Sequence, residues 1–247
     1  MEDKILGAVC VIVGAGEGLG RALAVKFAAE GFNIALIARS EYRCAGTMEA
    51  VRCSSKKVDI QFFYADVLKP ETVESSISAI VEAMGEIDVL IYNVRGAFKA
   101  CAPLDMSYAD LGDNYQLEVI GAFAAAKSVL PSMIKRSRGS VFFSSATAAF
   151  RGSAHYPLYA IGKFGLRGLS QSLAKAYGKD GVHIVHFRLD CDLDVPIMEK
   201  LYGDRYDPTK LADPEDVAKT YWLTYLQPRG AWSNEVEIRP SSETWTY

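Results

Sequence analysis

Short apolar runs alternate with longer amphipathic stretches along most of the chain. Each apolar run is rich in Val, Ile, Leu or Phe and is bounded by Gly or polar residues, which is typical of buried strands. The sequence predicts strands at residues 8–13, 32–38, 58–64, 87–92, 139–145, 182–189 and 235–238. Helices are expected between them, at residues 21–30, 41–55 (a polar helix, or a loop and a helix), 69–84, 104–136, 158–177 and 213–226.

Proline and glycine mark helix ends and irregular segments. Pro70 and Pro214 stand in the first turns of their helices, where proline is favoured. The long helix at residues 104–136 is expected to break near Gly112 and near Gly121, with a kink at Pro131. Residues 146–157 are predicted to be a loop. Residues 190–205 are predicted to be irregular, with an apolar piece at 195–202 that could form a mobile flap over a site.

This alternation predicts an α/β fold in which a doubly wound parallel sheet of about seven strands carries helices on both faces. No repeat, low-complexity tract or linker divides the 247 residues, so one domain spanning residues 1–247 is expected. A ligand then lies beyond the carboxyl ends of the strands. The residues at these ends are the glycine-rich loop, Arg39, Asp66, Asn93, Ser145 and Cys191.

The glycine-rich loop runs from Gly14 to Gly20, between a strand and a helix. Gly14 permits the tight turn, Gly18 lets the backbone approach a pyrophosphate, and Gly20 allows close packing of the helix. Gly16, Glu17 and Leu19 complete the loop, and the helix start offers N–H groups to phosphates. The sequence therefore predicts a dinucleotide site, against the alternative of a turn that binds no ligand.

The end of the second strand predicts which nicotinamide cofactor is bound. An acid at this point accepts from the ribose 2′-hydroxyl, whereas arginine accommodates a 2′-phosphate. Arg39 stands there without an acid beside it, which favours NADP(H) over NAD(H), although Glu17 would repel the phosphate. Asp66 and Val67 follow the third strand, where an adenine amino group could be met, but an Asp there is also a common helix cap.

Tyr159 and Lys163 are four residues apart and so lie on one helix face. An ammonium near a phenol lowers the phenol's pKa, and such a Tyr can exchange a proton with a carbonyl or alcohol oxygen. Ser145 could hydrogen-bond the same oxygen. The alternative is that Tyr159 and Lys163 are only a buried Tyr and a Lys on an ordinary amphipathic helix. The glycine loop upstream favours a catalytic role for them instead.

Composition and charge limit the classes of partner that the protein is expected to bind. A formal net charge of −3 gives no basic bias toward nucleic acid, and no apolar run looks long enough to cross a bilayer. Five scattered cysteines indicate reduced thiols. His183 and His186 are expected to be packing residues, so no metal site is predicted. Neither end of the chain resembles a targeting signal, so a cytoplasmic location is expected.

These motifs resemble the short-chain dehydrogenase/reductase (SDR) family over nearly the whole chain, with its Rossmann-type fold. The loop from Gly14 to Gly20 is similar to that family's TGxxxGxG, with Val13 in place of Thr. The resemblance implies reversible hydride transfer between a nicotinamide cofactor and a carbonyl or secondary alcohol. It implies that Tyr159 is the general acid/base, that Lys163 tunes Tyr159 and binds the nicotinamide ribose, and that Ser145 positions the substrate oxygen.

The chain departs from the family pattern in three places. The family's NNAG is Tyr92-Asn93-Val94-Arg95, which retains Asn93 as a cofactor residue but replaces Gly by Arg95. Glu118 stands where the family has a structural Asn that acts in a proton relay through its main-chain carbonyl. Asp190-Cys191 replaces Pro-Gly, and Val195 replaces Thr, although Leu193 could still offer backbone contacts to the carboxamide end of the cofactor.

Two other functions compete with an NADP(H)-dependent carbonyl reductase or alcohol dehydrogenase. One is a non-catalytic dinucleotide-binding sensor or scaffold, which the three departures suggest and the intact Ser145, Tyr159 and Lys163 oppose. The other is an S-adenosylmethionine methyltransferase, which would need an acid where Arg39 stands.

The substrate is expected to be a small carbonyl or alcohol compound of unspecified identity. An apolar pocket could be lined by Phe150, Tyr156, Met198 and Tyr202, unless these only pack the flap. The resemblance also implies a homodimer or homotetramer, paired through the helices at about residues 104–136 and 158–177.

Overall fold

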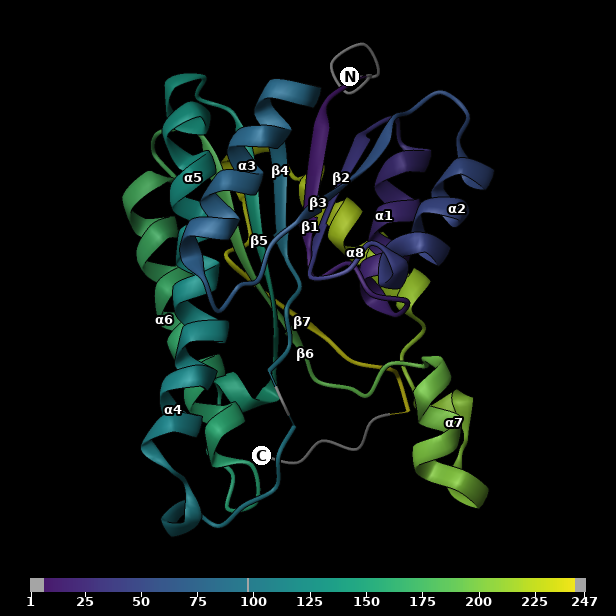
Figure 1. Cartoon of the computed structure of the whole chain (residues 1–247), viewed down its shortest axis with the longest axis vertical. Helices are drawn as coiled ribbons and strands as arrows, with labels where there is room; N and C mark the ends of the chain where they lie inside the picture. Colours follow the sequence, from purple (N-terminus) through teal and green to yellow (C-terminus); the bar gives the residue numbers. More distant parts are fainter. Residues whose placement is uncertain (1–6, 97, 243–247) are drawn as a thin grey trace.

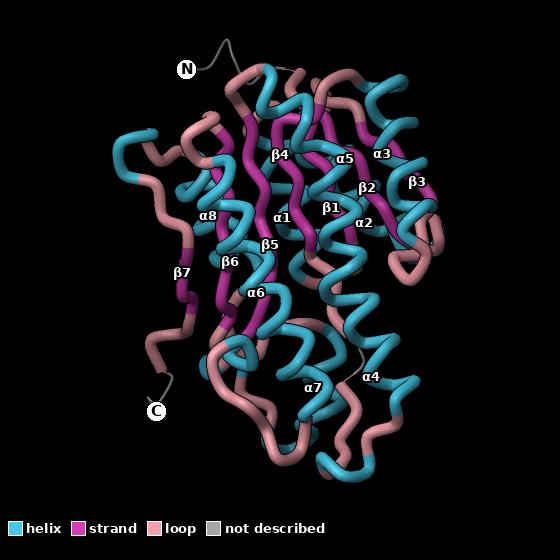
Figure 2. Tube along the Cα trace, turned by 90° about the vertical axis from the view of Figure 1, so that its left-hand side faces the viewer, coloured by secondary structure: helices cyan, strands magenta, loops and turns pink. Residues whose placement is uncertain are grey.

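The computed structural model describes residues 7–96 and 98–242 and contains one parallel sheet (Figures 1 and 2). Its strand order is β3-β2-β1-β4-β5-β6-β7. The strands are β1 (Val9–Val13), β2 (Asn33–Ala38), β3 (Ile60–Tyr64), β4 (Ile87–Tyr92), β5 (Gly139–Ala146), β6 (Val182–Leu189) and β7 (Glu235–Ile238). The predicted fold class is confirmed, and every predicted strand is present with ends that differ by two residues at most.

Helices cover both faces of the sheet. The main ones are α1 (Leu19–Ala29), α2 (Ala45–Ser54), α3 (Pro70–Met84), α4 (Tyr108–Tyr115), α5 (Gly121–Lys135), α6 (Pro157–Tyr177), α7 (Pro196–Tyr202) and α8 (Pro214–Tyr225). Helices α1, α2 and α8 lie on one face, and α3, α5 and α6 lie on the other (Figure 1).

The alternation of side chains along β1 explains the two faces. Cys10 and Ile12 point into the core beneath α1 and α8, whereas Val9, Val11 and Val13 point toward α3 and α5. Because both faces are covered, all five β1 residues are buried. The strand order reverses beside β1, where β1 pairs with both β2 and β4. A ligand crevice is expected beyond the carboxyl ends at such a point.

The long central helix is continuous where breaks were predicted. Gly112 and Gly121 both lie within Tyr108–Lys135, and Pro131 lies inside α5, which continues four residues beyond it. The irregularity is instead a π-helical turn, η4 (Gln116–Ile120). Gly121 is tolerated because α5 packs closely there: a Cβ at this position would lie 2.7 Å from the Tyr92 hydroxyl.

The same helix corrects the expectation that no stretch is long enough to cross a bilayer. By length and composition alone the 28 residues Tyr108–Lys135 pass that test. More than half of the most apolar part is buried inside the protein, against α3, β4 and α6, as in the core helix of a sheet protein.

Two predicted irregular segments contain helix. The loop at residues 146–157 includes the short helix η5 (Thr147–Ala149), and Pro196 opens α7 within the predicted flap.

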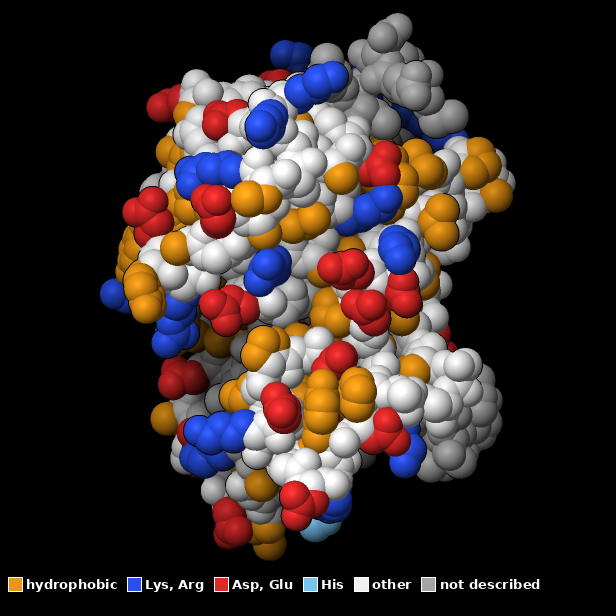
Figure 3. Space-filling model, turned by 90° about the vertical axis from the view of Figure 1, so that its right-hand side faces the viewer, with side chains coloured by type: hydrophobic (Ala, Val, Ile, Leu, Met, Phe, Trp, Pro, Cys, Tyr) orange, Lys and Arg blue, Asp and Glu red, His pale blue; other side chains and the backbone are white. Residues whose placement is uncertain are grey.

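The terminal residues used for the targeting predictions lie largely outside the described part. Figure 3 shows acidic and basic side chains mixed over the face nearest α2 and α7, with hydrophobic side chains between them in both halves of the view.

Candidate active site

The glycine-rich loop is shaped by close backbone contacts. Gly14 has φ +87°, and a Cβ there would lie 2.8 Å from the carbonyl oxygen of Asn93. A Cβ on Gly20 would lie 2.8 Å from the carbonyl oxygen of Gly14, so α1 can start this close to β1 only with glycine. The Asn93 side chain donates to the Gly14 carbonyl at 3.1 Å and ties the end of β4 to the loop.

A cavity of about 940 Å³ opens beyond the carboxyl ends of the central strands. It brings together ten of the fourteen predicted site residues, namely Gly14, Gly16, Gly18, Leu19, Gly20, Asn93, Ser145, Tyr159, Lys163 and Leu193. Four predicted cofactor residues do not line it, namely Glu17, Arg39, Asp66 and Val67. The glycine loop and the Ser-Tyr-Lys set therefore share one cavity.

The four remaining residues lie toward the β2 and β3 side of the sheet. Arg39 and Glu17 are exposed, and the Glu17 carboxylate points toward Gly46 at the start of α2. The Asp66 carboxylate accepts the backbone N–H of Leu68 at 3.2 Å and so closes the turn before α3. Asp66 forms a turn and does not cap α3, because the N-cap residue is Lys69 and no side chain caps that helix. Val67 is buried against Gly121 of α5.

The two serines at the end of β5 have different surroundings. The Ser144 hydroxyl forms a hydrogen bond of 2.9 Å with the Tyr221 hydroxyl of α8. The Ser145 hydroxyl is buried at the cavity and has no hydrogen-bond partner among the described residues. A buried hydroxyl without a partner costs free energy, so a ligand oxygen is the natural partner for Ser145.

Tyr159 is half-buried on α6 with its ring in the cavity, and the Lys163 ammonium lies 5.6 Å from the ring centroid. Burial raises the pKa of Tyr159 above its ordinary value, and this effect outweighs Lys163, which lowers that pKa. The net lowering expected from the sequence is therefore not found in this structure.

Lys163 is almost completely buried and makes three polar contacts. Its Nζ lies 2.8 Å from Oε2 of Glu118 and donates to the carbonyl oxygens of Val94 at 3.4 Å and Ser144 at 3.3 Å. Burial acts to lower the pKa of Lys163, but Glu118 and Tyr159 together raise it above its ordinary value. The side chain of Glu118, not only its carbonyl, therefore belongs to the site.

Aromatic rings form one wall of the cavity. Phe98 stacks on Tyr156 with ring centroids 3.9 Å apart and meets Tyr159 edge-on at 5.3 Å. Arg95 also lines the cavity, with its guanidinium 5.8 Å from the Phe98 ring. Sequence reasoning missed Phe98, because it lies in the irregular chain after β4 and belongs to no motif.

Three of the four predicted pocket residues, Tyr156, Met198 and Tyr202, line the cavity. The prediction for Phe150 was wrong. Its ring lies between the guanidinium groups of Arg167, at 3.7 Å, and Arg188, at 4.0 Å. These cation–π contacts hold Phe150 toward β7 and away from the cavity.

The segment after β6 covers the glycine loop. A Cγ atom of Val195 lies 3.0 Å from the Cβ position of Gly18. Tyr202 donates to the Asp192 carboxylate at 2.5 Å, and Tyr206 donates to the Asp194 carboxylate at 2.6 Å. These bonds tie the C-terminal end of α7 and the chain after it to the residues that follow β6.

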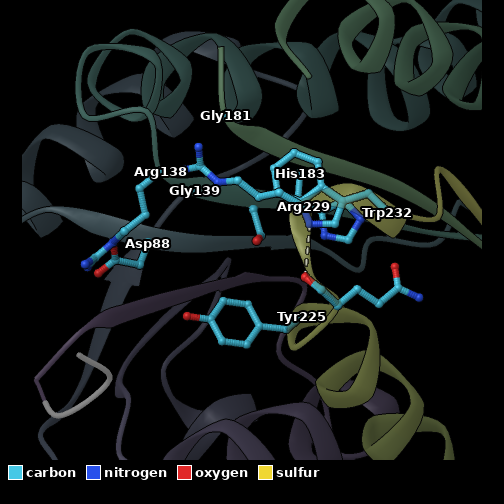
Figure 4. Close-up of a pocket in the computed structure, with 10 residues that line it drawn as sticks. Asp88, Arg138, Gly139, Gly181, His183, Tyr225, Arg229 and Trp232 are labelled. Atoms are coloured by element: carbon cyan, nitrogen blue, oxygen red, sulfur yellow. Dashed lines mark hydrogen bonds and ion pairs between the residues drawn. The ribbon is translucent and has the colours of Figure 1, made fainter. Parts of the chain in front are cut away.

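A second hollow, of about 190 Å³, lies at the opposite ends of the strands (Figure 4). His183 stacks there on Trp232 with centroids 4.6 Å apart, and its Nε2 lies 2.9 Å from the Ser233 carbonyl oxygen. Asp88 is held by Arg136 at 2.9 Å and by Arg138 at 2.6 Å. The His183 contacts fix the segment before β7 to the sheet, and the Asp88 contacts join β4 to the chain between α5 and β5. Among the described residues, no group of three or more His, Cys, Asp or Glu is placed to hold a metal ion.

Comparison with known proteins decides the family. A family profile described as short chain dehydrogenase matches residues 8–189. This chain is a member of the short-chain dehydrogenase/reductase family. It is 29% identical over 228 residues to a short-chain dehydrogenase/reductase of Armillaria gallica, covering 86% of each protein. The family's enzymes are NAD(P)-dependent dehydrogenases and reductases, and this chain is an oxidoreductase of that kind.

Solved structures agree with the fold. The crystal structure of a short-chain dehydrogenase from Rhodopseudomonas palustris is 27% identical, with a TM-score of 0.80, covering 95% of this SDR chain and 99% of that one. A metagenomic short-chain oxidoreductase in complex with NADP is 21% identical, with a TM-score of 0.82 and coverage of 96% and 98%. The second likeness shows the fold alone.

Proposed function

We propose that this SDR enzyme reduces a carbonyl group, or oxidises the corresponding secondary alcohol, with NADP(H) as the hydride carrier. The observation that carries the proposal is the buried, unpartnered Ser145 hydroxyl in the same cavity as Tyr159, Lys163 and the glycine-rich loop. A hydroxyl without a partner, in the same cavity as a phenol, suits a substrate oxygen that must be held while it gains or loses a proton.

The cavity fits a dinucleotide. Nothing lies within 4 Å of the Cβ position of Gly16, so this part of the loop is open to a ligand, whereas Gly14 and Gly20 are closed by backbone. The loop and the start of α1 would hold the pyrophosphate, with Asn93 fixing the loop from β4. Leu193 and Val195 would contact the cofactor from the covering segment.

The protein's own residues supply the proton chemistry. The bound cofactor supplies or accepts the hydride. In the reductive direction Tyr159 donates its phenolic proton to the substrate oxygen, and Ser145 donates a hydrogen bond to the same oxygen. Because the pKa of Tyr159 is raised, the phenol is protonated at neutral pH and ready to act as an acid. In the oxidative direction Tyr159 takes the proton back.

The cofactor preference rests on Arg39. This side chain is exposed at the end of β2, its neighbours in the chain, Ala38 and Ser40, are not acids, and a related fold is known in complex with NADP. The test is a fluorescence titration with NADPH and, separately, NADH, on the natural protein and on Arg39→Ala. We expect NADPH to bind at least tenfold more tightly than NADH, and Arg39→Ala to remove that difference while leaving NADH binding unchanged. Stronger binding of NADH by the natural protein would overturn the preference.

The active form is proposed to be a homodimer or homotetramer in the cytoplasm. Phe123 of α5 and both Ile161 and Phe164 of α6 are 38–45% exposed, on the two helices that the family resemblance assigns to pairing. Exposed apolar side chains on adjacent helices suit an interface between copies. Light scattering of the purified protein tests this, and a monomer at micromolar concentration would contradict it.

A non-catalytic cofactor sensor is the second candidate, and the contact between Lys163 and Glu118 favours it, because this contact engages the lysine within the protein. The two functions differ in turnover. Binding of NADPH without reduction of any aldehyde or ketone in a broad panel would favour the sensor.

A further inference from the structure

Glu118 is a completely buried carboxylate beside the reacting residues. It lies in the π-helical turn η4, and its two oxygens have separate partners: Oε2 contacts the Lys163 ammonium at 2.8 Å, and Oε1 accepts the backbone N–H of Gly96 at 2.8 Å. A buried carboxylate is retained only where it is paired and hydrogen-bonded in this way. Neither contact explains by itself why a charge is placed here.

Two glycines, Gly96 and Gly162, make room for this side chain. A Cβ on Gly162 would lie 2.8 Å from Cγ of Glu118, and a Cβ on Gly96 would lie 3.1 Å from its Oε1. Asn114 fills the space next to it and donates to the Leu158 carbonyl oxygen at 2.6 Å, one turn before Gly162. Glu118 is therefore built into the packing between η4, α6 and the chain after β4.

The charges around Tyr159 come from four elements. Lys163 lies on its own helix and Arg95 on the chain after β4, and both favour the phenolate. Glu118 of η4 and Asp192 of the covering segment both favour the phenol. Arg95 and Asp192 are exposed, so solvent screens them, whereas Lys163 and Glu118 are both buried. Burial has the largest effect on the pKa of Tyr159, and among the charges around it the buried pair of Lys163 and Glu118 matters most.

We propose that Glu118 is a positioning residue that neutralises Lys163 and so, together with burial, keeps Tyr159 protonated, which poises the enzyme for carbonyl reduction. Without the carboxylate the ammonium would act on the phenol uncompensated and favour the phenolate, the form needed to oxidise an alcohol. Glu118 would also hold Lys163 toward η4, since the lysine's other contacts are carbonyl oxygens at 3.3 Å and beyond. This inference deepens the proposed function and rests on Tyr159 being its acid.

The test measures the ionisation of Tyr159 without any substrate. Protein labelled with ¹³C at the tyrosine ζ carbon is titrated by NMR, and Tyr159→Phe identifies the Tyr159 signal. In Glu118→Gln we expect the midpoint of that signal to fall by about one pH unit or more, a tenfold change in the ionisation ratio. Glu118→Asp retains the charge and should keep most of the natural midpoint.

Glu74→Gln is the matched control, because it removes an exposed carboxylate paired with Lys127 on the surface. It should leave the midpoint unchanged. A midpoint in Glu118→Gln that equals or exceeds the natural one would overturn the proposal. If that variant does not fold, Glu118→Asp and the natural protein decide: a Tyr159 midpoint below 7 in the natural protein would contradict a protonated acid.

Turnover separates this inference from the proposed function. In an active enzyme, the alkaline limb of kcat/KM for reduction should move to lower pH in Glu118→Gln, since the first proton leaves the Tyr159–Lys163 pair more easily. An enzyme without turnover would end the proposed function, yet the NMR midpoints would still report whether Glu118 controls Tyr159.

Discussion

Replacing Lys163 by methionine should destabilise the protein far more than the loss of one surface charge would. The change leaves the Glu118 carboxylate completely buried, with the Gly96 N–H as its remaining close partner. Removing one member of a buried ion pair costs about 3–5 kcal/mol, because the other charge stays desolvated and uncompensated. The two carbonyl oxygens that accept from Lys163 also lose a donor, at about 1 kcal/mol each at most.

The assay is urea unfolding followed by circular dichroism at pH 7. The free energy of unfolding of a native protein is about 5–15 kcal/mol. A loss of this size therefore shifts the midpoint of the urea transition measurably. The double variant Lys163→Met with Glu118→Gln removes both charges and should recover about 2 kcal/mol relative to Lys163→Met alone. The Lys127–Glu74 pair is the control: its atoms are 3.3 Å apart but its side chains are 62% and 45% exposed.

Lys127→Met should cost less than about 1 kcal/mol, because solvent screens an exposed pair. The reasoning is refuted if Lys163→Met also lies within about 1 kcal/mol of the natural protein. It is equally refuted if the double variant is no more stable than Lys163→Met, since the uncompensated carboxylate would then not be the source of the loss.

Two further predictions concern packing and pH. Gly162→Ala should cost about 1–3 kcal/mol in thermal or urea unfolding, because its Cβ would lie 2.6 Å from Nδ2 of Asn114, whereas Gly168→Ala on the same helix meets nothing within 4 Å and should be neutral or stabilising. Burial lowers the pKa of His186 to about 4, so below pH about 6.5 the unfolded chain binds a proton that the folded chain does not. The free energy of unfolding should therefore fall by about 3 kcal/mol between pH 7 and pH 4 in urea titrations, and His186→Gln should remove most of that fall; an equal fall in the variant would contradict this.

Local patterns were enough to predict the sheet, because each strand is a short apolar run and each face is covered by a helix. Residues 87–92, 182–189 and 235–238 were predicted with their observed ends. The central helix was harder. Gly112 and Gly121 look like breaks in a sequence, yet Gly121 is kept helical by its close contact with Tyr92, which no local pattern reveals.

The residues of the candidate site also fall into those that local patterns predict and those that depend on contacts between distant parts of the chain. The glycine loop, Ser145, Tyr159 and Lys163 could be predicted because each follows a strand or lies at helical spacing, and the structure places them in one cavity. The side-chain role of Glu118 could not be predicted, because it depends on the space left by Gly96 and Gly162. The position of Phe150 also escaped, because it depends on Arg167 and Arg188, which lie far along the chain.

The most direct test of the proposed reaction is NADPH oxidation by the natural protein and by Tyr159→Phe, with a panel of aldehydes and ketones, alongside NADPH binding to both. We predict that Tyr159→Phe binds NADPH with the natural affinity but loses at least a hundredfold in turnover, the usual contribution of a general acid. Turnover in Tyr159→Phe equal to that of the natural protein would contradict the role of Tyr159 as the acid that protonates the substrate oxygen.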